Sequence, residues 1–357
     1  MLFNNTYTLG GSRAAANQER QALLPLLLHG RAESVGVLGV ATGSTLAGAA
    51  LAPGVARIEA AELSPLVLRQ AQAHFRPFNR GVFADPRVRV VQDDARWFIT
   101  GAPGRFDVVV GDLFLPWRTG EGRLYAREHF AAVRRALRPD GLFCQWLPLF
   151  QLTRPQYDAI VRTFHAEFPE AFVVRGDFYT DLPILGLVGG RPAGSLDWAA
   201  VAAQCDRLRA AGQTADPLVR HVEGVAMLVV GPLPPSAPGP VITLANGWLE
   251  WDAGRNIVGL RTPWFVGIPA AEFVRDIHRA TQPAMPAELR AAHDAGQFWL
   301  TLEVAARTRS PALDNLRAQI TGRLPATLLA DAAASWSEWP GREKPHALPD
   351  PAGSLIP

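Results

Sequence analysis

Between residues 34 and 189, the sequence alternates between short apolar runs and helix-like segments. The apolar runs, rich in β-branched and aliphatic residues, are Ser34–Val40, Val55–Glu62, Arg87–Gln92, Phe106–Gly111, Gly141–Pro148, Ala171–Arg175 and Pro183–Gly189. The helix-like segments between them include Ser64–Phe75, Arg127–Gly141 and Thr153–Pro169. Ser64 and Pro65 suit the N-cap and first turn of a helix, and Pro-Asp-Gly at 139–141 suits a closing turn. This alternation predicts an α/β fold with a doubly wound parallel sheet and helices on both faces.

Composition narrows the class of protein further. Of the 357 residues, 48% are hydrophobic and 19% are charged, which is typical of a globular protein. A net charge of +2 gives no reason to expect nucleic acid or an anionic membrane as a partner. The two cysteines, Cys144 and Cys205, are too far apart in sequence to predict a metal site or a disulfide framework. With no signal peptide or membrane span in the sequence, we expect a cytoplasmic protein without a metal.

Composition also predicts four parts: an N-terminal lead-in (1–33), the α/β domain (34–190), a mainly helical C-terminal region (191–340) and a flexible tail (341–357). Within the C-terminal region, Ser195–Gly212 predicts an amphipathic helix. The Pro-rich segment Gly231–Pro240 predicts a break, and Asn246–Asn256 reads as a short polar and aromatic stretch before further helices.

A turn of small residues follows the first strand-like run. Gly39, Ala41 and Gly43 alternate with Val40 and Thr42, and a helix-like segment comes next. Small residues let the backbone approach a ligand closely, and the start of a helix offers unpaired N–H groups. The turn therefore predicts a nucleoside-binding loop. The alternative is a tight turn that only packs the helix on the strand.

Carboxylates follow the next strand-like runs. Glu62 lies about twenty residues after the glycine turn, where an acidic residue can accept both hydroxyls of a ribose. Asp93 and Asp94 end the third run; we expect Asp94 to face an adenine edge and Asp93 to cap the helix starting near Ala95, or to be solvated. For Glu62, the alternative is a solvent-exposed strand end.

The fourth run ends in Asp112, which is followed by more apolar residues and Pro116. A carboxylate there is costly to bury unless something pairs with it or uses it. Since ligands of open α/β sheets bind beyond the carboxyl ends of the strands, we predict a catalytic role for Asp112. A loop-capping hydrogen bond is the alternative.

Three further stretches carry a resemblance to a known family: ERQALLPLLLH at 19–29, LYAREHF at 124–130 and GLFCQWLPLFQLT at 141–153. Together with the strand ends, they resemble the spermidine synthase-like (polyamine aminopropyltransferase) branch of the S-adenosylmethionine-dependent methyltransferase fold. The likeness covers 4–189 and is greatest for the soluble domain of bacterial proteins often fused to membrane segments. It implies a Rossmann-like class I methyltransferase fold with a seven-stranded, mostly parallel sheet.

The resemblance also implies roles for individual residues. Its nucleoside site would comprise Gly39, Ala41, Thr42, Gly43, Glu62, Asp93, Asp94, Ala95 and Asp112. The donor would be S-adenosylmethionine or its decarboxylated form, and Asp112 would help to deprotonate an accepting amine. Gln145 matches a glutamine common in the family, and its role is left open.

Two positions depart from the family pattern. Thr42 stands where aminopropyltransferases usually carry an acidic residue, and Leu115 replaces their usual second aspartate. A dicationic diamine needs compensating carboxylates, so these changes weaken the expectation of putrescine as acceptor.

Three functions therefore stay open: aminopropyl transfer to a small amine, methyl transfer to an unknown acceptor, and nucleoside binding without catalysis. A homodimer and a membrane-protein partner are both compatible with the sequence, and the acceptor itself is not identified by it.

Overall fold

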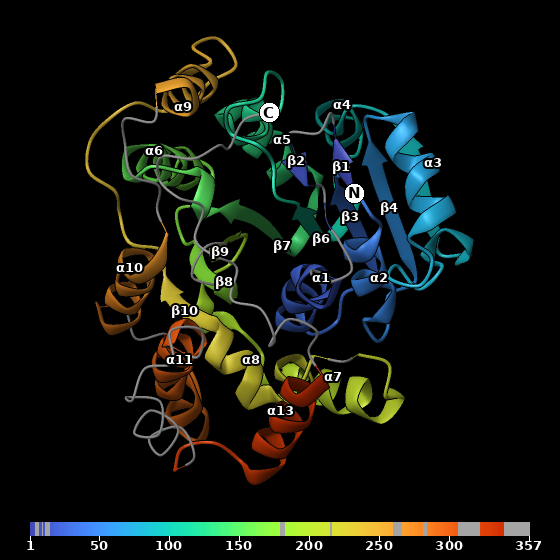
Figure 1. The fold of residues 1–357 in the computed structure, drawn as a ribbon, viewed down its shortest axis with the longest axis vertical. Coiled ribbons are helices and arrows are strands. Elements are labelled where there is room, and N and C mark those ends of the chain that lie inside the picture. The colour runs from blue at the N-terminus through green and yellow to red at the C-terminus, as the bar shows by residue number, and fades with distance from the viewer. Residues whose placement is uncertain are drawn as a thin grey trace.

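An eight-stranded sheet forms the centre of the molecule (Figure 1). The computed structural model describes residues 1–3, 7–8, 10, 15–178, 183–214, 216–259, 266–280, 284–305 and 322–338. In spatial order, the strands are β10 (Val229–Pro232), β8 (Phe172–Phe178), β9 (Pro183–Gly189), β7 (Leu137–Pro148), β6 (Phe106–Gly111), β3 (Ser34–Leu38), β4 (Arg57–Glu62) and β5 (Val88–Gln92). A separate antiparallel pair joins β1 (Leu2–Phe3) and β2 (Tyr7–Thr8).

The sheet is mostly parallel, as predicted. Strand β3 pairs in parallel with β4 and β6, and these pair in parallel with β5 and β7. Strands β9, β8 and β10 continue the sheet in antiparallel fashion. The fold is the Rossmann-like methyltransferase fold, and the carboxyl ends of its five parallel strands lie along one edge.

The sheet has one strand more than the predicted seven. The extra strand is β10, which comes from the C-terminal region and pairs with β8, Val229 lying opposite Val174. Its last two residues, Gly231 and Pro232, are the first of the segment predicted as a Pro-rich break, and Pro232 lies opposite Phe172 at the end of the strand. The C-terminal region thus contributes to the central sheet as well as adding helices.

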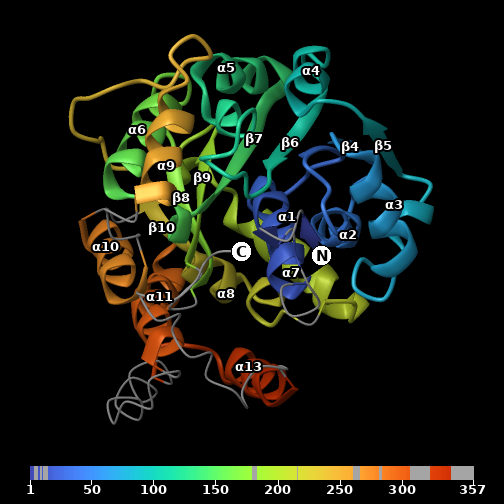
Figure 2. The same ribbon diagram turned by 45° about the horizontal axis from the view of Figure 1, so that its top comes forward.

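Helices cover both faces of the sheet (Figure 2). They are α1 (Ala15–His29), α2 (Ser44–Leu51), α3 (Pro65–His74), α4 (Ala95–Thr100), α5 (Arg127–Ala136), α6 (Arg154–His165), α7 (Trp198–Ala211), α8 (Val222–Leu228), α9 (Trp248–Gly259), α10 (Gly267–Ala280), α11 (Ala287–Ala305) and α13 (Ala326–Glu338). One apolar core lies under α1, α2, α7, α8 and α11, and a second lies under α4, α5, α6, α9 and α10. Strand β6 serves both cores, since Val108 and Val110 face the first and Val109 faces the second.

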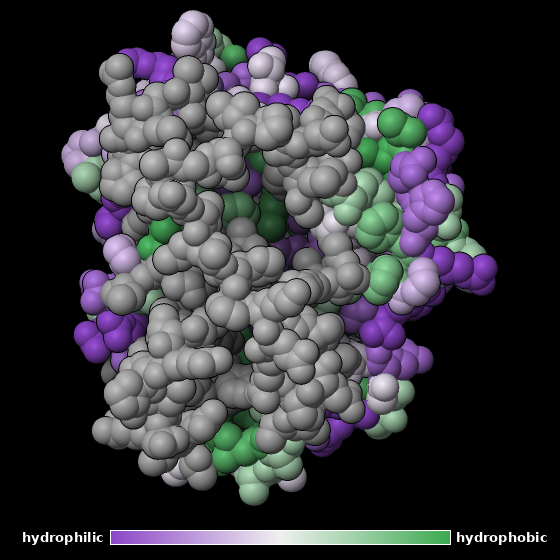
Figure 3. Space-filling model, viewed as in Figure 1, coloured by the Kyte–Doolittle hydropathy of each residue, from purple (hydrophilic) through white to green (hydrophobic). Residues whose placement is uncertain are grey.

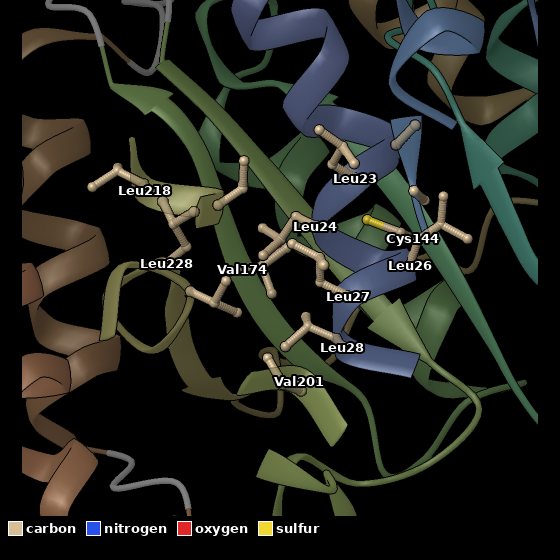
Figure 4. Close-up of a cluster of buried hydrophobic side chains, with 14 of the residues drawn as sticks. Leu23, Leu24, Leu26, Leu27, Leu28, Cys144, Val174, Val201, Leu218 and Leu228 are labelled. Carbon is tan, nitrogen blue, oxygen red and sulfur yellow. The ribbon is translucent and has the colours of Figure 1, made fainter. Parts of the chain in front are cut away.

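Helix α1 is buried along nearly its whole length. Figure 4 shows its leucines packed among side chains that include Val174 of the sheet, Val201 of α7 and Leu228 of α8. Its polar residues are buried too, and Arg20 forms a two-pronged salt bridge with Asp216, in which Nη2 lies 2.9 Å from Oδ1. The apolar stretch before the first parallel strand is therefore a core helix that joins the α/β domain to the C-terminal region.

Local sequence signals place most helix ends correctly. Ser64 caps α3, accepting a hydrogen bond from the amide of Val67, and Pro65 is the first helical residue, as predicted. The predicted helix Arg127–Gly141 is wrong at its end, because α5 stops at Ala136 and β7 begins at Leu137. Pro139 disfavours helical geometry at the residue before it, and the Pro-Asp-Gly turn becomes an irregularity inside β7, where Asp140 has φ 63°.

Two segments of the C-terminal region also differ from expectation. The predicted helix Ser195–Gly212 begins later, at Trp198, because Asp197 caps it through the amide of Ala200. The stretch Asn246–Asn256 is mostly helix α9, whose start is set by the Asn246 side chain accepting from the amide of Trp248. The predicted tail, 341–357, lies outside the described residues.

Exposed apolar side chains are scattered over the surface. The large ones are Leu63, Leu66, Phe78, Trp97, Leu244 and Trp251. On the face shown in Figure 3, apolar and polar residues are interspersed over the α3 side. None of the helices in the described ranges is long and apolar enough to cross a membrane.

We predict that the Arg20–Asp216 pair is essential to stability. Both side chains are almost fully buried, so Asp216→Asn removes a buried negative charge that lies against the Arg20 guanidinium. Loss of one partner from a buried pair should lower the free energy of unfolding by roughly 3–5 kcal/mol. Urea denaturation of the full chain measures this. As a control, Asp206→Asn removes a partner from the exposed pair with Arg209 and should cost less than about 1 kcal/mol.

Candidate functional site

The turn between β3 and α2 has an unusual backbone. Gly39 and Gly43 have φ values of 85° and 84°, and between them Ala41 has φ 48°. A left-handed conformation at a residue with a Cβ costs about 1–2 kcal/mol, so the surrounding structure must stabilise it. The turn that was predicted to approach a nucleoside is therefore strained as well as tight.

Glu62, at the end of β4, holds this turn in place. Its Oε2 accepts hydrogen bonds from the amides of Val40 and Ala41 at 3.1 and 3.2 Å, and its Oε1 accepts from Ser64 at 2.9 Å. A carboxylate has about four lone-pair sites, so three are occupied by backbone donors. Ribose hydroxyls would have to share Glu62 with the turn or displace some of these donors.

Thr42 faces α1. Its hydroxyl lies 3.2 Å from Gln18 Oε1 and 3.2 Å from the Ser44 hydroxyl, and its carbonyl accepts from Asn79 Nδ2 at 2.9 Å. All of these side chains are buried. The hydroxyl that stands in place of the family's usual acidic residue is thus used to fasten the turn to α1, a contact that the sequence did not reveal.

The structure corrects one predicted role of the two aspartates after β5, the cap of the following helix. The N-cap of α4 is Asp94, not Asp93, and its carboxylate accepts from the amide of Arg96 at 2.9 Å. The Arg96 guanidinium also binds Asp94, and this pairing lowers the pKa of Asp94. Asp93 is exposed and accepts from the amide of Asp94, while Ala95 is the first residue of α4. The adenine contact of Asp94 remains a prediction, and its carboxylate already has a cationic partner.

Asp112 is buried, with 8% of its surface exposed. Its Oδ1 accepts from the amide of Leu113 at 2.8 Å, and its Oδ2 lies 3.3 Å from the hydroxyl of Thr45 on α2. No cationic side chain among the described residues pairs with it. Burial, reinforced by the nearby charge of Glu62, raises the pKa of Asp112 to about 6. A carboxyl of this kind can exchange a proton near neutral pH.

Gln145 of β7 supports the backbone beneath Asp112. Its Nε2 donates to the carbonyl oxygens of Asp112 and Trp146 at 3.0 Å each. Its buried Oε1 has no hydrogen-bond partner in the part of the chain that is described. A Cβ at Gly111 would collide with the end of this side chain, so a larger residue at the end of β6 would require Gln145 to shift. The sequence left the role of Gln145 open and gave no signal for Thr45 or Gly111.

The structure gathers most of the predicted residues at one edge of the sheet. If Gly39 carried a Cβ, that atom would lie 3.6 Å from the Cβ of Asp112. The Asp93 amide donates to the Glu62 carbonyl at 3.2 Å. The glycine turn, Glu62, the two aspartates and Asp112 thus follow neighbouring strands. Leu115, by contrast, is buried in the second apolar core. Among the described residues, Asp112 and Glu62 at this edge have no cationic partner, and the glycine turn beside them has a backbone that a ligand can approach closely.

A family model described as "Spermine/spermidine synthase domain" matches residues 15–175. Residues 15–175 belong to the spermine/spermidine synthase family. The matched stretch of this synthase domain includes α1, all five parallel strands and every residue of the candidate site.

Curated relatives match the synthase domain only in part. A polyamine aminopropyltransferase of Aeropyrum pernix is 35% identical over 140 residues, or 38% of this chain and 44% of the relative. A polyamine aminopropyltransferase of Mycobacterium tuberculosis is 41% identical over 114 residues, or 31% of this chain and 22% of the relative. The chain therefore matches less than half the length of these two relatives.

Two solved structures are similar to part of the chain. Spermidine synthase from Thermotoga maritima is 23% identical, with a TM-score of 0.43 over 49% of this chain and 60% of that chain. Human methyltransferase-like protein 13 in complex with SAH is 22% identical, with a TM-score of 0.42 over 55% of this chain and 91% of that chain.

The raised pKa of Asp112 predicts a pH-dependent cost to stability. Burial raises it from 3.8 to about 6, so the folded synthase domain retains a proton that the unfolded chain loses first. Stability should therefore fall as the pH rises from about 4 to about 6 and stay lower above that range. Asp112→Asn removes the charge and can keep both hydrogen bonds. We expect this variant to be more stable than the parent by roughly 1–3 kcal/mol at about pH 7.5, with no gain at about pH 4. Urea unfolding at both pH values measures the difference, and a loss of stability at both would contradict the assignment.

Proposed function

We propose that this chain is a transferase that uses an S-adenosyl sulfonium donor. In its leading form, it moves an aminopropyl group from decarboxylated S-adenosylmethionine to an amine acceptor. Membership of residues 15–175 in the spermine/spermidine synthase family and the partial relatives named polyamine aminopropyltransferase support a transferase.

One observation carries the proposal: Asp112 is a buried carboxylate without a cationic partner among the described residues, beside a left-handed glycine turn. Burying such a charge is unfavourable unless a ligand compensates for it. Both the sulfonium of the donor and a protonated amine acceptor are cations, and either would stabilise the ionised form of Asp112. The left-handed turn beside it places small residues where an adenosyl group would lie, so the backbone can approach the ligand closely.

The reaction is an in-line displacement. The lone pair of a neutral amine attacks the carbon next to the sulfonium; a C–N bond forms as the C–S bond breaks, and the thioether leaves with the electron pair. Asp112, with a pKa of about 6, can accept the proton that the amine must lose. Glu62 and the glycine turn would orient the nucleoside part, so that positioning provides most of the remaining acceleration.

A second candidate, methyl transfer from S-adenosylmethionine, is favoured by two observations. The Thr42 hydroxyl is engaged with Gln18 and Ser44, and Leu115 is part of the apolar core. Neither position supplies a carboxylate for the distant ammonium group of a diamine. An acceptor with one amine, or with none, needs only Asp112.

The ligand class can be tested first by thermal unfolding of the full chain. We expect S-adenosylmethionine, decarboxylated S-adenosylmethionine or methylthioadenosine to stabilise the protein. At 100 times its dissociation constant, a ligand adds roughly 2.7 kcal/mol, enough to raise the melting temperature measurably. Glu62→Gln should weaken this binding, because an amide is a poorer acceptor for ribose hydroxyls. A shift with a dinucleotide and with none of the three compounds would contradict the proposal.

The second test concerns turnover. Asp112→Asn should still bind donor, because Glu62 and the glycine turn are unchanged, whereas its rate should fall by roughly 100-fold or more. Mass spectrometry of the product distinguishes an added aminopropyl group from an added methyl group. Donor binding with no transfer to a panel of amines would indicate a nucleoside-binding module instead. If Asp112→Asn left a demonstrated transferase activity unchanged, the catalytic role of Asp112 would be wrong.

A further inference from the structure

Helix α9 of the C-terminal region contacts the loop that follows Asp112. We call residues 113–122 the Asp112 loop. The amide of Gly120 in this loop donates to Glu250 Oε1 at 2.7 Å, and Arg123 Nε lies 3.8 Å from the same oxygen. The Glu250 side chain is only 14% exposed. The C-terminal region thus places a largely buried carboxylate against the loop next to the candidate catalytic residue.

The contact is close-packed as well as hydrogen-bonded. A Cβ at Gly122 would lie 2.5 Å from Glu250 Cγ and 2.7 Å from the carbonyl oxygen of Pro116. Any other residue at 122 would therefore push the loop away from α9. Gly120, with φ 93°, turns its amide toward Glu250 in a conformation that favours glycine. Both glycines fit the loop to the Glu250 side chain.

Hydrogen bonds inside the loop connect this contact with Asp112. Glu121, next to Gly120, accepts from the amide of Leu115 at 2.9 Å. Tyr125 donates to the carbonyl of Phe114 at 2.8 Å, and the amide of Leu113 donates to Asp112 itself at 2.8 Å. A displacement at Gly120 would therefore be passed on to the amide that helps to stabilise the Asp112 carboxylate.

Helix α9 is held independently of the loop. Asp252 accepts from Gln156 Nε2 of α6 at 2.9 Å, and Figure 2 shows α9 beside α6. The segment before α9 is fastened to α5, where the amide of Leu244 donates to Glu128 at 3.0 Å and the amide of Arg127 donates to the carbonyl of Ile242 at 2.9 Å. Glu250 is thus presented from a fixed support.

We propose that Glu250 is a positioning residue, which holds the Asp112 loop from α9 so that Asp112 and the acceptor side of the site are in place before substrate binds. Its role in catalysis rests on the proposed function, whereas its hold on the loop does not. The C-terminal region then takes part in the reaction through one carboxylate.

Three variants of the full chain separate this role from a general effect on stability. Glu250→Ala removes the acceptor for the Gly120 amide, whereas Glu250→Gln keeps an oxygen that can accept it. Asp252→Ala is the matched control: it removes a carboxylate of the same helix that binds α6 and not the loop, while the Leu244–Glu128 and Arg127–Ile242 contacts still hold the segment before α9.

Hydrogen exchange of the loop amides is the first measurement. We expect Glu250→Ala to accelerate exchange in residues 113–122 by about ten-fold or more, the factor that corresponds to a loss of 1.4 kcal/mol. Glu250→Gln and Asp252→Ala should exchange like the parent in this segment. Unchanged exchange in Glu250→Ala, or equal acceleration in Asp252→Ala, would overturn the proposal.

The second measurement is the titration of Asp112 by carboxyl carbon NMR, with its signal assigned by its loss in Asp112→Asn. The groups that face Asp112 are the Leu113 amide, the Thr45 hydroxyl and the Glu62 charge. Losing the Leu113 hydrogen bond removes one that favours the ionised form, so the pKa should rise in Glu250→Ala and not in Glu250→Gln. An unchanged pKa in Glu250→Ala would show that the contact of Glu250 with the loop does not affect Asp112, and would refute the positioning role.

Steady-state kinetics test whether the Glu250–Gly120 contact affects the reaction. In Glu250→Ala, the KM for the acceptor should rise and the acidic limb of the rate profile should move to higher pH, while donor affinity stays unchanged. Unaltered acceptor kinetics despite a mobile loop would refute the role in catalysis. If the parent protein did not bind donor, only the proposed function would be refuted. Hydrogen exchange and the Asp112 titration would still decide whether Glu250 positions Asp112.

Discussion

The carboxylate of Glu62 is the acceptor on which the candidate site depends. The turn after β3 leaves the amides of Val40 and Ala41 pointing away from any regular partner, and Glu62 accepts both. Because buried or partly buried N–H groups are costly to leave unpaired, this one side chain allows Ala41 to keep a left-handed backbone. The position of Gly39 beside Asp112 follows from the same turn. The acidic residue at the end of β4 therefore stabilises the turn even without a ligand.

Because Glu62 already accepts these hydrogen bonds, a ligand must compete with backbone amides for its carboxylate. A nucleoside that binds Glu62 must offer hydroxyls to a carboxylate already shared among three amides. The exchange of one donor for another costs little in itself, since hydrogen bonds are replaced and not lost. It does, however, couple ligand binding to the conformation of the turn, and through Thr42 to helix α1. Glu62, the turn and the packing of α1 are thus parts of one hydrogen-bonded unit, to which the proposed donor would bind.

The sequence predicted those features that short-range physics determines. Ser64 and Pro65 start α3 because a hydroxyl and a fixed φ act within one turn, and β6 ends at Gly111 because its apolar run ends there. The cap expected at Asp93 lies at Asp94, because both side chains are good caps and the sequence alone does not choose between them, whereas the alternative that Asp93 is solvated is confirmed. Strand β10 and the contact of Glu250 with Gly120 were beyond prediction, since their partners lie far away in sequence. Of the site, the carboxylates were found and the groups that hold them, such as Thr45 and Gln145, were not.

The salt bridge between Arg20 and Asp216 has a consequence for how the chain folds as it is made. Its partners are 196 residues apart, and Arg20 leaves the ribosome first. At ordinary rates of translation, roughly 10–40 s pass before Asp216 is synthesised. Until then, α1 lacks the buried carboxylate that Arg20 binds in the folded chain, and β8 lacks β10 along its outer edge. The helix that is synthesised first is therefore among the last elements to settle, and the nascent sheet depends on a segment that has yet to be translated.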